Sequence, residues 1–116
     1  MDHPDLCRVD DALGILVGKW KPIILLFLLQ SDKMRFNELK RNMPGITQKM
    51  LTQQLRELEE EDIIARKVYP QVPPKVEYSI TEYGKSLKPI LEAMHEWGTR
   101  HTLHKLKKNN QGSLPL

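Results

Sequence analysis

The spacing of apolar residues in the first part of the chain predicts two helices in succession. A first helix, which Asp10 or Asp11 can cap, runs to about Val17 and ends at Gly18. A second helix begins near Trp20 and is apolar on every side. A helix that is apolar all round is buried, so this segment predicts the centre of the core.

Two shorter amphipathic helices are predicted next, separated by a tight turn. Apolar residues keep helical spacing from Phe36 to Met43, and a Pro-Gly pair ends this third helix. Thr47 can cap a fourth helix that runs to about Glu61. Two short helices joined in this way are typical of a helix-turn-helix.

The period of the pattern changes after the fourth helix, from helical to alternating. Residues 64–69 and 76–80 alternate as two half-buried strands do. The link at residues 70–75 is rich in proline, which cannot extend a strand ladder, so it predicts a stiff hairpin tip. The order of elements predicts a mainly α fold with a small β-hairpin, the winged helix-turn-helix.

A long last helix, beginning at Thr81 and Glu82, carries a stripe of apolar residues. The stripe is more apolar than a helix lying alone on a small domain requires. We expect it to pack with the first helix against the same elements of a second chain in a two-fold homodimer. A role in the core of its own domain is the alternative. The domain then spans residues 1–108, and residues 109–116 form a flexible tail. The predicted dimer-interface residues are Leu13, Leu87, Ile90, Leu91, Met94 and Trp97.

The polar side of the fourth helix carries the strongest functional signal. Three leucines define its core side, and at about 100° per residue the opposite side holds side chains that can bond to base edges in the major groove of DNA. Acidic residues gather at the C-terminal end, away from the N-terminal half that enters the groove. A merely solvated face is the alternative. The predicted base-reading residues are Gln48, Lys49, Thr52, Gln53 and Arg56.

Basic side chains on the neighbouring elements predict contacts with DNA phosphates. Such contacts supply affinity without sequence preference. For each charge taken singly, a plain solvated side chain is the simpler interpretation, so the pattern of turn, helix and hairpin carries the prediction. The predicted phosphate-binding residues are Lys19, Lys40, Arg41, Thr47, Arg66, Lys67 and Lys75.

Composition sets broad limits on the class of protein. The chain has 116 residues, 40% of them hydrophobic, which fits one globular domain. The net charge of +3 is too small to imply nucleic acid by itself. The polar start does not look like a signal peptide, and the longest apolar run, at residues 23–29, is too short to span a bilayer. We therefore expect a cytoplasmic protein.

Several short motifs, in the right order, resemble the HxlR-type family of bacterial transcriptional regulators. The resemblance covers about residues 7–100. It implies a dimeric winged-helix repressor or activator, similar in shape to the MarR group. From its two-fold symmetry, the expected dimer should bind a near-palindromic DNA operator. The motifs are Gly18-Lys19-Trp20-Lys21, Arg35-Phe36-Asn37-Glu38-Leu39, Ile46-Thr47-Gln48-Lys49-Met50-Leu51-Thr52, Leu55-Arg56-Glu57-Leu58, the run from Val72 to Gly84, and Trp97-Gly98.

The single cysteine, Cys7, excludes an intramolecular disulfide. The resemblance implies a sensor of oxidants or electrophiles at this place, which adds a reactive small-molecule effector to the expected partners. A thiol near a helix N-terminus favours thiolate, although the family's usual Cys-Pro is Cys7-Arg8 here. Packing as a small apolar side chain is the alternative.

Other classes of site have weaker support. His95, His101 and His104 are too few to complete a metal site, and the sequence has no phosphate-binding glycine loop and no catalytic triad signature. We therefore expect no enzyme, no metal and no cofactor. The leading alternative function is a winged-helix module that binds protein instead of DNA.

Overall fold

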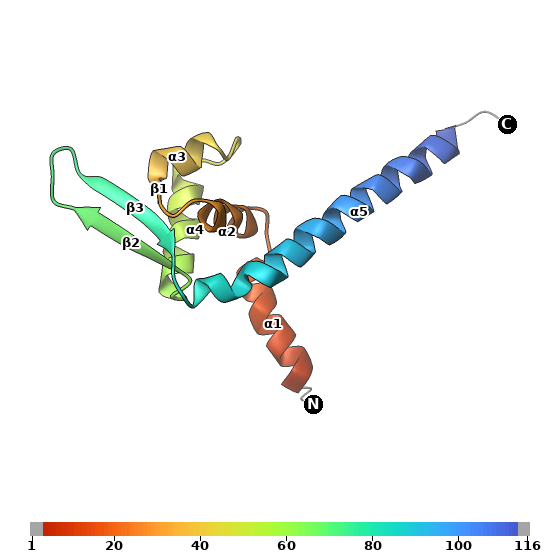
Figure 1. Ribbon diagram of the computed structural model, residues 1–116, viewed down its shortest axis with the longest axis horizontal. Helices are drawn as coiled ribbons and strands as arrows, with labels where there is room; N and C mark the ends of the chain where they lie inside the picture. The colour runs from red at the N-terminus through yellow and green to blue at the C-terminus, as the bar shows by residue number, and fades with distance from the viewer. Residues whose placement is uncertain (1–3, 114–116) are drawn as a thin grey trace. The chain divides into compact units, whose positions relative to one another are not determined.

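The chain folds as a succession of helices followed by a β-hairpin and a long terminal helix (Figure 1). The computed structural model describes the backbone of residues 4–113 and the side chains of residues 8–110. It contains two compact units, one reaching to Ser86 and the other starting at Leu87. The elements are α1 Pro4–Leu16, α2 Trp20–Gln30, β1 Met34–Arg35, α3 Phe36–Arg41, α4 Gln48–Glu60, β2 Ile64–Tyr69, β3 Lys75–Ile80, a 3₁₀ turn Gly84–Leu87, and α5 Lys88–Ser113.

The core of the first unit forms where α2 and α4 pack against each other and against the sheet. The prediction that α2 is buried is confirmed at Ile24, Leu25 and Leu28. The three leucines at positions 51, 55 and 58 form the buried side of α4, as expected from their spacing. Each such side chain stabilises the fold by about 1.5–3 kcal/mol when it leaves water. This burial fixes which side of α4 faces outward.

The sheet is antiparallel, with strand order β1-β3-β2. Ile64 pairs with Ile80 at the base of the hairpin and Tyr69 pairs with Lys75 near its tip. The hairpin extends away from helices α2, α3 and α4 (Figure 1). The predicted half-burial of the hairpin strands is confirmed for β3, whose residues are half-buried or buried. In β2 it is wrong for the four residues from Ala65 to Val68, which are exposed, whereas Ile64 is buried and Tyr69 is half-buried.

A cap and a turn set the direction of α4. The hydroxyl oxygen of Thr47 accepts a hydrogen bond of 3.0 Å from the backbone N–H of Met50, which confirms the predicted cap. Gly45 precedes it with a φ of +93°, a conformation that glycine adopts without steric cost. The Thr47 cap and the glycine turn thus fix the direction in which the chain enters α4 after α3.

The first and last helices begin elsewhere than the sequence predicted. Helix α1 starts at Pro4, so Asp10 and Asp11 lie inside the helix and cap nothing. Thr81 caps the 3₁₀ turn rather than a helix, because its hydroxyl accepts from the backbone N–H of Gly84 at 2.8 Å. Helix α5 starts only at Lys88 and stays helical to Ser113, past the position where a tail was expected.

Candidate nucleic-acid interface

The outward side of α4 carries all five predicted base-reading side chains. Gln48, Lys49, Thr52, Gln53 and Arg56 are exposed, and the leucines between them are buried. The hydroxyl of Thr52 donates to the backbone oxygen of Gln48 at 2.8 Å, a bond that leaves the methyl group free for contact with a thymine. The helix therefore presents a continuous polar surface on a fixed support.

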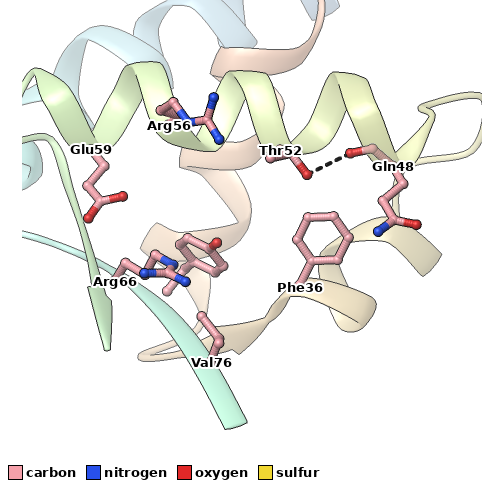
Figure 2. A pocket seen from close by; sticks show the side chains of 8 residues that line it. Phe36, Gln48, Thr52, Arg56, Glu59, Arg66 and Val76 are labelled. Atoms are coloured by element: carbon pink, nitrogen blue, oxygen red, sulfur yellow. Dashed lines mark hydrogen bonds between the residues drawn. The ribbon is translucent and has the colours of Figure 1, made fainter. Parts of the chain in front are cut away.

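Part of this surface faces the hairpin across a cleft of about 480 Å³ (Figure 2). Figure 2 shows Gln48, Thr52 and Arg56 along one side of α4, with Glu59 at its far end. The opposite wall comes from the start of α3 and from both long strands. The lining residues on that wall are Phe36, Arg66, Val76 and Tyr78.

A second part of the α4 surface is held by an ionic network with α2. The side-chain nitrogen of Gln53 donates to Glu57 Oε2 at 2.6 Å. Lys21 Nζ donates to Glu57 Oε1 at 2.5 Å, and the two side chains keep 14% and 37% of their surface exposed. The hydrogen bond from Lys21, followed by that from Gln53, holds the pKa of Glu57 below its ordinary value. Glu57 is therefore an ionised link between α2 and a base-reading candidate.

The phosphate candidates on the helices are exposed and lie at helix ends. Lys19 precedes α2, with its ammonium nitrogen 4.5 Å from the centre of the Trp20 ring. Lys40 and Arg41 occupy the last turn of α3, and Arg41 borders a second cleft of about 770 Å³ between α3 and the hairpin tip. The hydroxyl of Thr47 is engaged in its cap. Lys40, Arg41 and Thr47 therefore precede the polar surface of α4 directly along the chain, whereas Lys19 lies at the start of α2.

The hairpin candidates gather around Tyr69. The ammonium nitrogens of Lys67 and Lys75 each lie 4.8 Å from the centre of the Tyr69 ring. Lys75 Nζ also lies 3.4 Å from Glu77 Oε2. The hydrogen bond between Tyr69 and Glu77 raises the pKa of the phenol and lowers the pKa of the carboxyl group. Arg66 lies nearer the base of the hairpin and lines the first cleft.

Sequence reasoning missed three contributors to this surface. Helical spacing places Phe36 on the third helix, but it does not indicate that this half-buried side chain lines both clefts. From the sequence, Lys21 is a basic residue that opens the second helix and Glu57 is one of the acids at the C-terminal end of the fourth, and neither position indicates that the two side chains pair. The pairing of Lys67 with Glu77 and of Tyr69 with Lys75 could have been derived from the hairpin register.

The predicted dimer-interface residues differ in exposure within the single chain. Leu13 on α1 and Ile90 on α5 are 46% and 45% exposed, and Trp97 reaches 59%. Met94 is exposed and Leu87 half-buried, whereas Leu91 is buried at 1% and adds no exposed surface. The exposed apolar residues of α5 also include Leu103 and Leu106, which the sequence prediction had left out.

The remaining candidates concern cysteine and histidine chemistry. Cys7 falls within α1, and its side chain lies outside the described residues. On α5, His101 stacks between Trp97 and His104, with ring centres 4.8 Å and 6.4 Å away. Among side chains 8–110, no group of three or more His, Cys, Asp or Glu residues could hold a metal ion.

No single helix in the described part of the chain is both long and apolar enough to cross a membrane. Segments Arg8–Leu16 and Trp20–Gln30 meet the criteria of length and composition only when they are taken together, across a bend of 78°.

Comparison with known proteins gives matches over most of the chain. The family model for HxlR-like helix-turn-helix proteins matches residues 15–106. YtcD of Bacillus subtilis, an uncharacterised helix-turn-helix-type transcriptional regulator, is 57% identical over 93 residues, which cover 80% of this chain and 73% of YtcD.

Solved structures of similar proteins share the fold. The redox regulator HypR in its reduced form has a TM-score of 0.79 at 51% identity, covering 84% of this chain and 98% of HypR. A transcriptional regulator of Enterococcus faecalis V583 that is assigned to the MarR family has a TM-score of 0.76 at 34% identity. The match covers 92% of this chain and 96% of that regulator. The winged-helix, MarR-like fold class predicted from the sequence is thereby confirmed.

Proposed function

The chain belongs to the HxlR-like helix-turn-helix family, and from this premise we propose that it binds duplex DNA with α4 in the major groove and the hairpin beside it. Members of this family are transcriptional regulators, not enzymes, and they bind DNA and typically act as dimers. This chain is accordingly a transcriptional regulator. The roles of its individual residues are the substance of the proposal.

The observation that carries the proposal is the exposed polar side of α4 on a buried leucine support. Gln48, Lys49, Thr52, Gln53 and Arg56 are of the types that bond to base edges or contact the thymine methyl. Rigid placement of such groups gives sequence preference, because a base edge must be met at a defined position and angle. The basic residues that precede α2 or belong to α3 and the hairpin then hold the phosphates. They are Lys19, Lys40, Arg41, Arg66, Lys67 and Lys75, with Thr47 at the N-terminus of α4.

The proposed active form is a homodimer that uses the exposed apolar residues of α1 and α5. Leu13, Ile90, Met94 and Trp97 would leave water at the interface, with Leu87 at its edge. A two-fold dimer presents two copies of α4, so its operator is a near-palindrome with half-sites about one helical turn, or a multiple of it, apart. Sedimentation at micromolar concentration should give the mass of two chains. Detection of the monomer alone would contradict the proposed homodimer.

Selection of bound duplexes from a random DNA pool tests the function itself. We expect enrichment of one near-palindromic site, and affinity for random DNA that falls as salt rises, because phosphate contacts release counterions. The contrasting function is a winged-helix module that binds protein. It predicts neither enrichment nor salt-dependent binding to duplex DNA, and that result would overturn the proposal.

A response to thiol-reactive compounds through Cys7 is a second proposal. The similar protein HypR is named a redox regulator and has been solved in oxidised and reduced forms. With one cysteine per chain, a lasting response needs a disulfide to Cys7 of a second chain or to a small thiol. Treatment with diamide should change operator binding of the native protein but not of Cys7→Ser. Equal operator binding by the native protein and by Cys7→Ser, each with and without diamide, would leave Cys7 as a packing residue.

DNA binding also agrees with the cytoplasmic location expected from the sequence.

A further inference from the structure

Gln53 differs from the other base-reading candidates because a neighbouring side chain holds its amide. Its nitrogen donates to Glu57 Oε2 at 2.6 Å, one helical turn further along α4. Glu57 is held in turn through its other oxygen by Lys21, a residue of α2 whose side chain is only 14% exposed. The chain of bonds therefore runs from a partly buried ammonium group to the exposed tip of a base-reading side chain.

An amide held in this way offers a defined pair of groups to DNA. The nitrogen carries two N–H groups and the oxygen has two lone pairs, so one bond to Glu57 leaves an N–H donor and a C=O acceptor unused. A donor and an acceptor side by side match N7 and the N6 amine of adenine in the major groove. Glu57 itself accepts only, which fixes the amide nitrogen, and not its oxygen, on the Glu57 side.

We infer that Glu57, anchored by Lys21, is a positioning residue that orients the Gln53 amide and so sets a preference for adenine at the base pair that Gln53 contacts. The inference rests on the proposed function of α4. The gain comes from an orientation set before binding, since a side chain that is already ordered loses less rotational freedom when it meets the base.

The test compares base preferences, measured by selection from a random duplex pool and by affinities for single-base variants of the selected site. Gln53→Ala should abolish the adenine preference at one base pair of each half-site. Glu57→Ala should weaken the preference at that same base pair about tenfold, within the range that a bidentate contact provides. The double variant should lose no more than Gln53→Ala does, because both changes act through one amide.

Two further variants separate positioning from charge and from folding. Glu60→Ala also removes one acid from the exposed part of α4, so it should raise affinity for all sequences alike and leave the base preference as it was. Lys21→Met keeps the acceptor beside Gln53 but frees it from α2, and should weaken the preference less than Glu57→Ala. Thermal unfolding of each variant shows that the compared proteins are folded.

The outcomes distinguish the inference from the function on which it rests. If Glu57→Ala keeps the native preference at the base pair altered by Gln53→Ala, or if that base is not adenine, the inference is overturned while DNA binding stands. If Gln53→Ala alters no base pair, the inference fails in the same way. Failure of the native protein to enrich any sequence would instead overturn the proposed function.

Discussion

Helix α4 and the hairpin β2–β3 are both polar and both face outward, yet they are supported in opposite ways. Helix α4 has three fully buried leucines beneath its polar side. In the hairpin only β3 and the base of β2 pack on the helices, and four consecutive residues of β2, from Ala65 to Val68, are exposed. The side chains of α4 are therefore placed by the core, and those of the outer part of β2 and of the hairpin tip are placed mainly by one another.

This contrast indicates how the two elements divide the work of recognition. Reading a base requires a side chain within hydrogen-bonding distance of one atom, which a supported helix provides. Attracting a phosphate requires only charge at moderate range, and Lys67 and Lys75 resting on the ring of Tyr69 provide that. This division supports the proposal that α4 supplies sequence preference and that the hairpin supplies a general affinity for DNA.

The largest difference between the two regions should appear in folding stability. Leu55 is buried at 1%, so Leu55→Ala should cost about 2–5 kcal/mol through lost transfer energy and the cavity left behind. Val68 on the hairpin is 49% exposed, and Val68→Ala should cost about 0.5 kcal/mol or less. Chemical denaturation measures both, and similar losses would show that the hairpin is packed as firmly as the helix.

The next largest loss of folding stability should come from a substitution at the junction between the end of α4 and the end of the hairpin. A Cβ atom on Gly84 would lie 2.2 Å from the backbone oxygen of Ile63, which follows α4, and 2.8 Å from Cγ1 of Ile80, which ends β3. Gly84→Ala should therefore destabilise the fold by roughly 1–3 kcal/mol or more, because backbone must move.

Gly14 provides the control for this substitution, since a Cβ there meets nothing within 4 Å. Gly14→Ala lies inside a helix and should be neutral or stabilise by up to about 1 kcal/mol. If Gly84→Ala lowers the free energy of unfolding no more than Gly14→Ala does, the backbone at the junction can move to accommodate a Cβ atom at little cost.

The sequence predicted what depends on local periodicity and local bonds. The buried helix α2, the Thr47 cap and the presence of the two hairpin strands all follow from residues close in the chain. The ion pair of Lys21 with Glu57 joins residues 36 apart, and no periodicity reports such a contact. The same holds for Phe36, which has helical spacing but lies where α3 meets the clefts. The hydroxyl of Thr81 donates to the backbone oxygens of Asp62 and Ile63, which is likewise a contact between segments far apart in the chain, and the 3₁₀ turn that it caps precedes α5.

Substitutions in α4 and in the hairpin should have different effects on DNA binding. Arg56→Ala on α4 should reduce discrimination at one base position by about 1–3 kcal/mol. Lys75→Ala on the hairpin should weaken binding to all sequences alike and lower the salt slope by about one. Affinities for the selected site and for single-base variants, at several salt concentrations, measure both quantities. A sequence-specific loss in Lys75→Ala would assign base reading to the hairpin as well.

The smallest expected effect concerns one carboxyl group in each region. The pKa values of Glu57 and Glu77 both lie below the ordinary value, chiefly through a hydrogen bond from Lys21 in the first case and from Tyr69 in the second. A lowered folded pKa stabilises the fold above the unfolded pKa of about 4.3, and this stability is lost as pH falls through the folded value. Lys21→Met should raise the pKa of Glu57 and leave the pKa of Glu77 unchanged. Tyr69→Phe should raise the pKa of Glu77 and leave the pKa of Glu57 unchanged. NMR titration of the two side chains measures both values. If either substitution shifted both groups, α4 and the hairpin would be electrostatically coupled, and the separate roles given to them here would have to be merged.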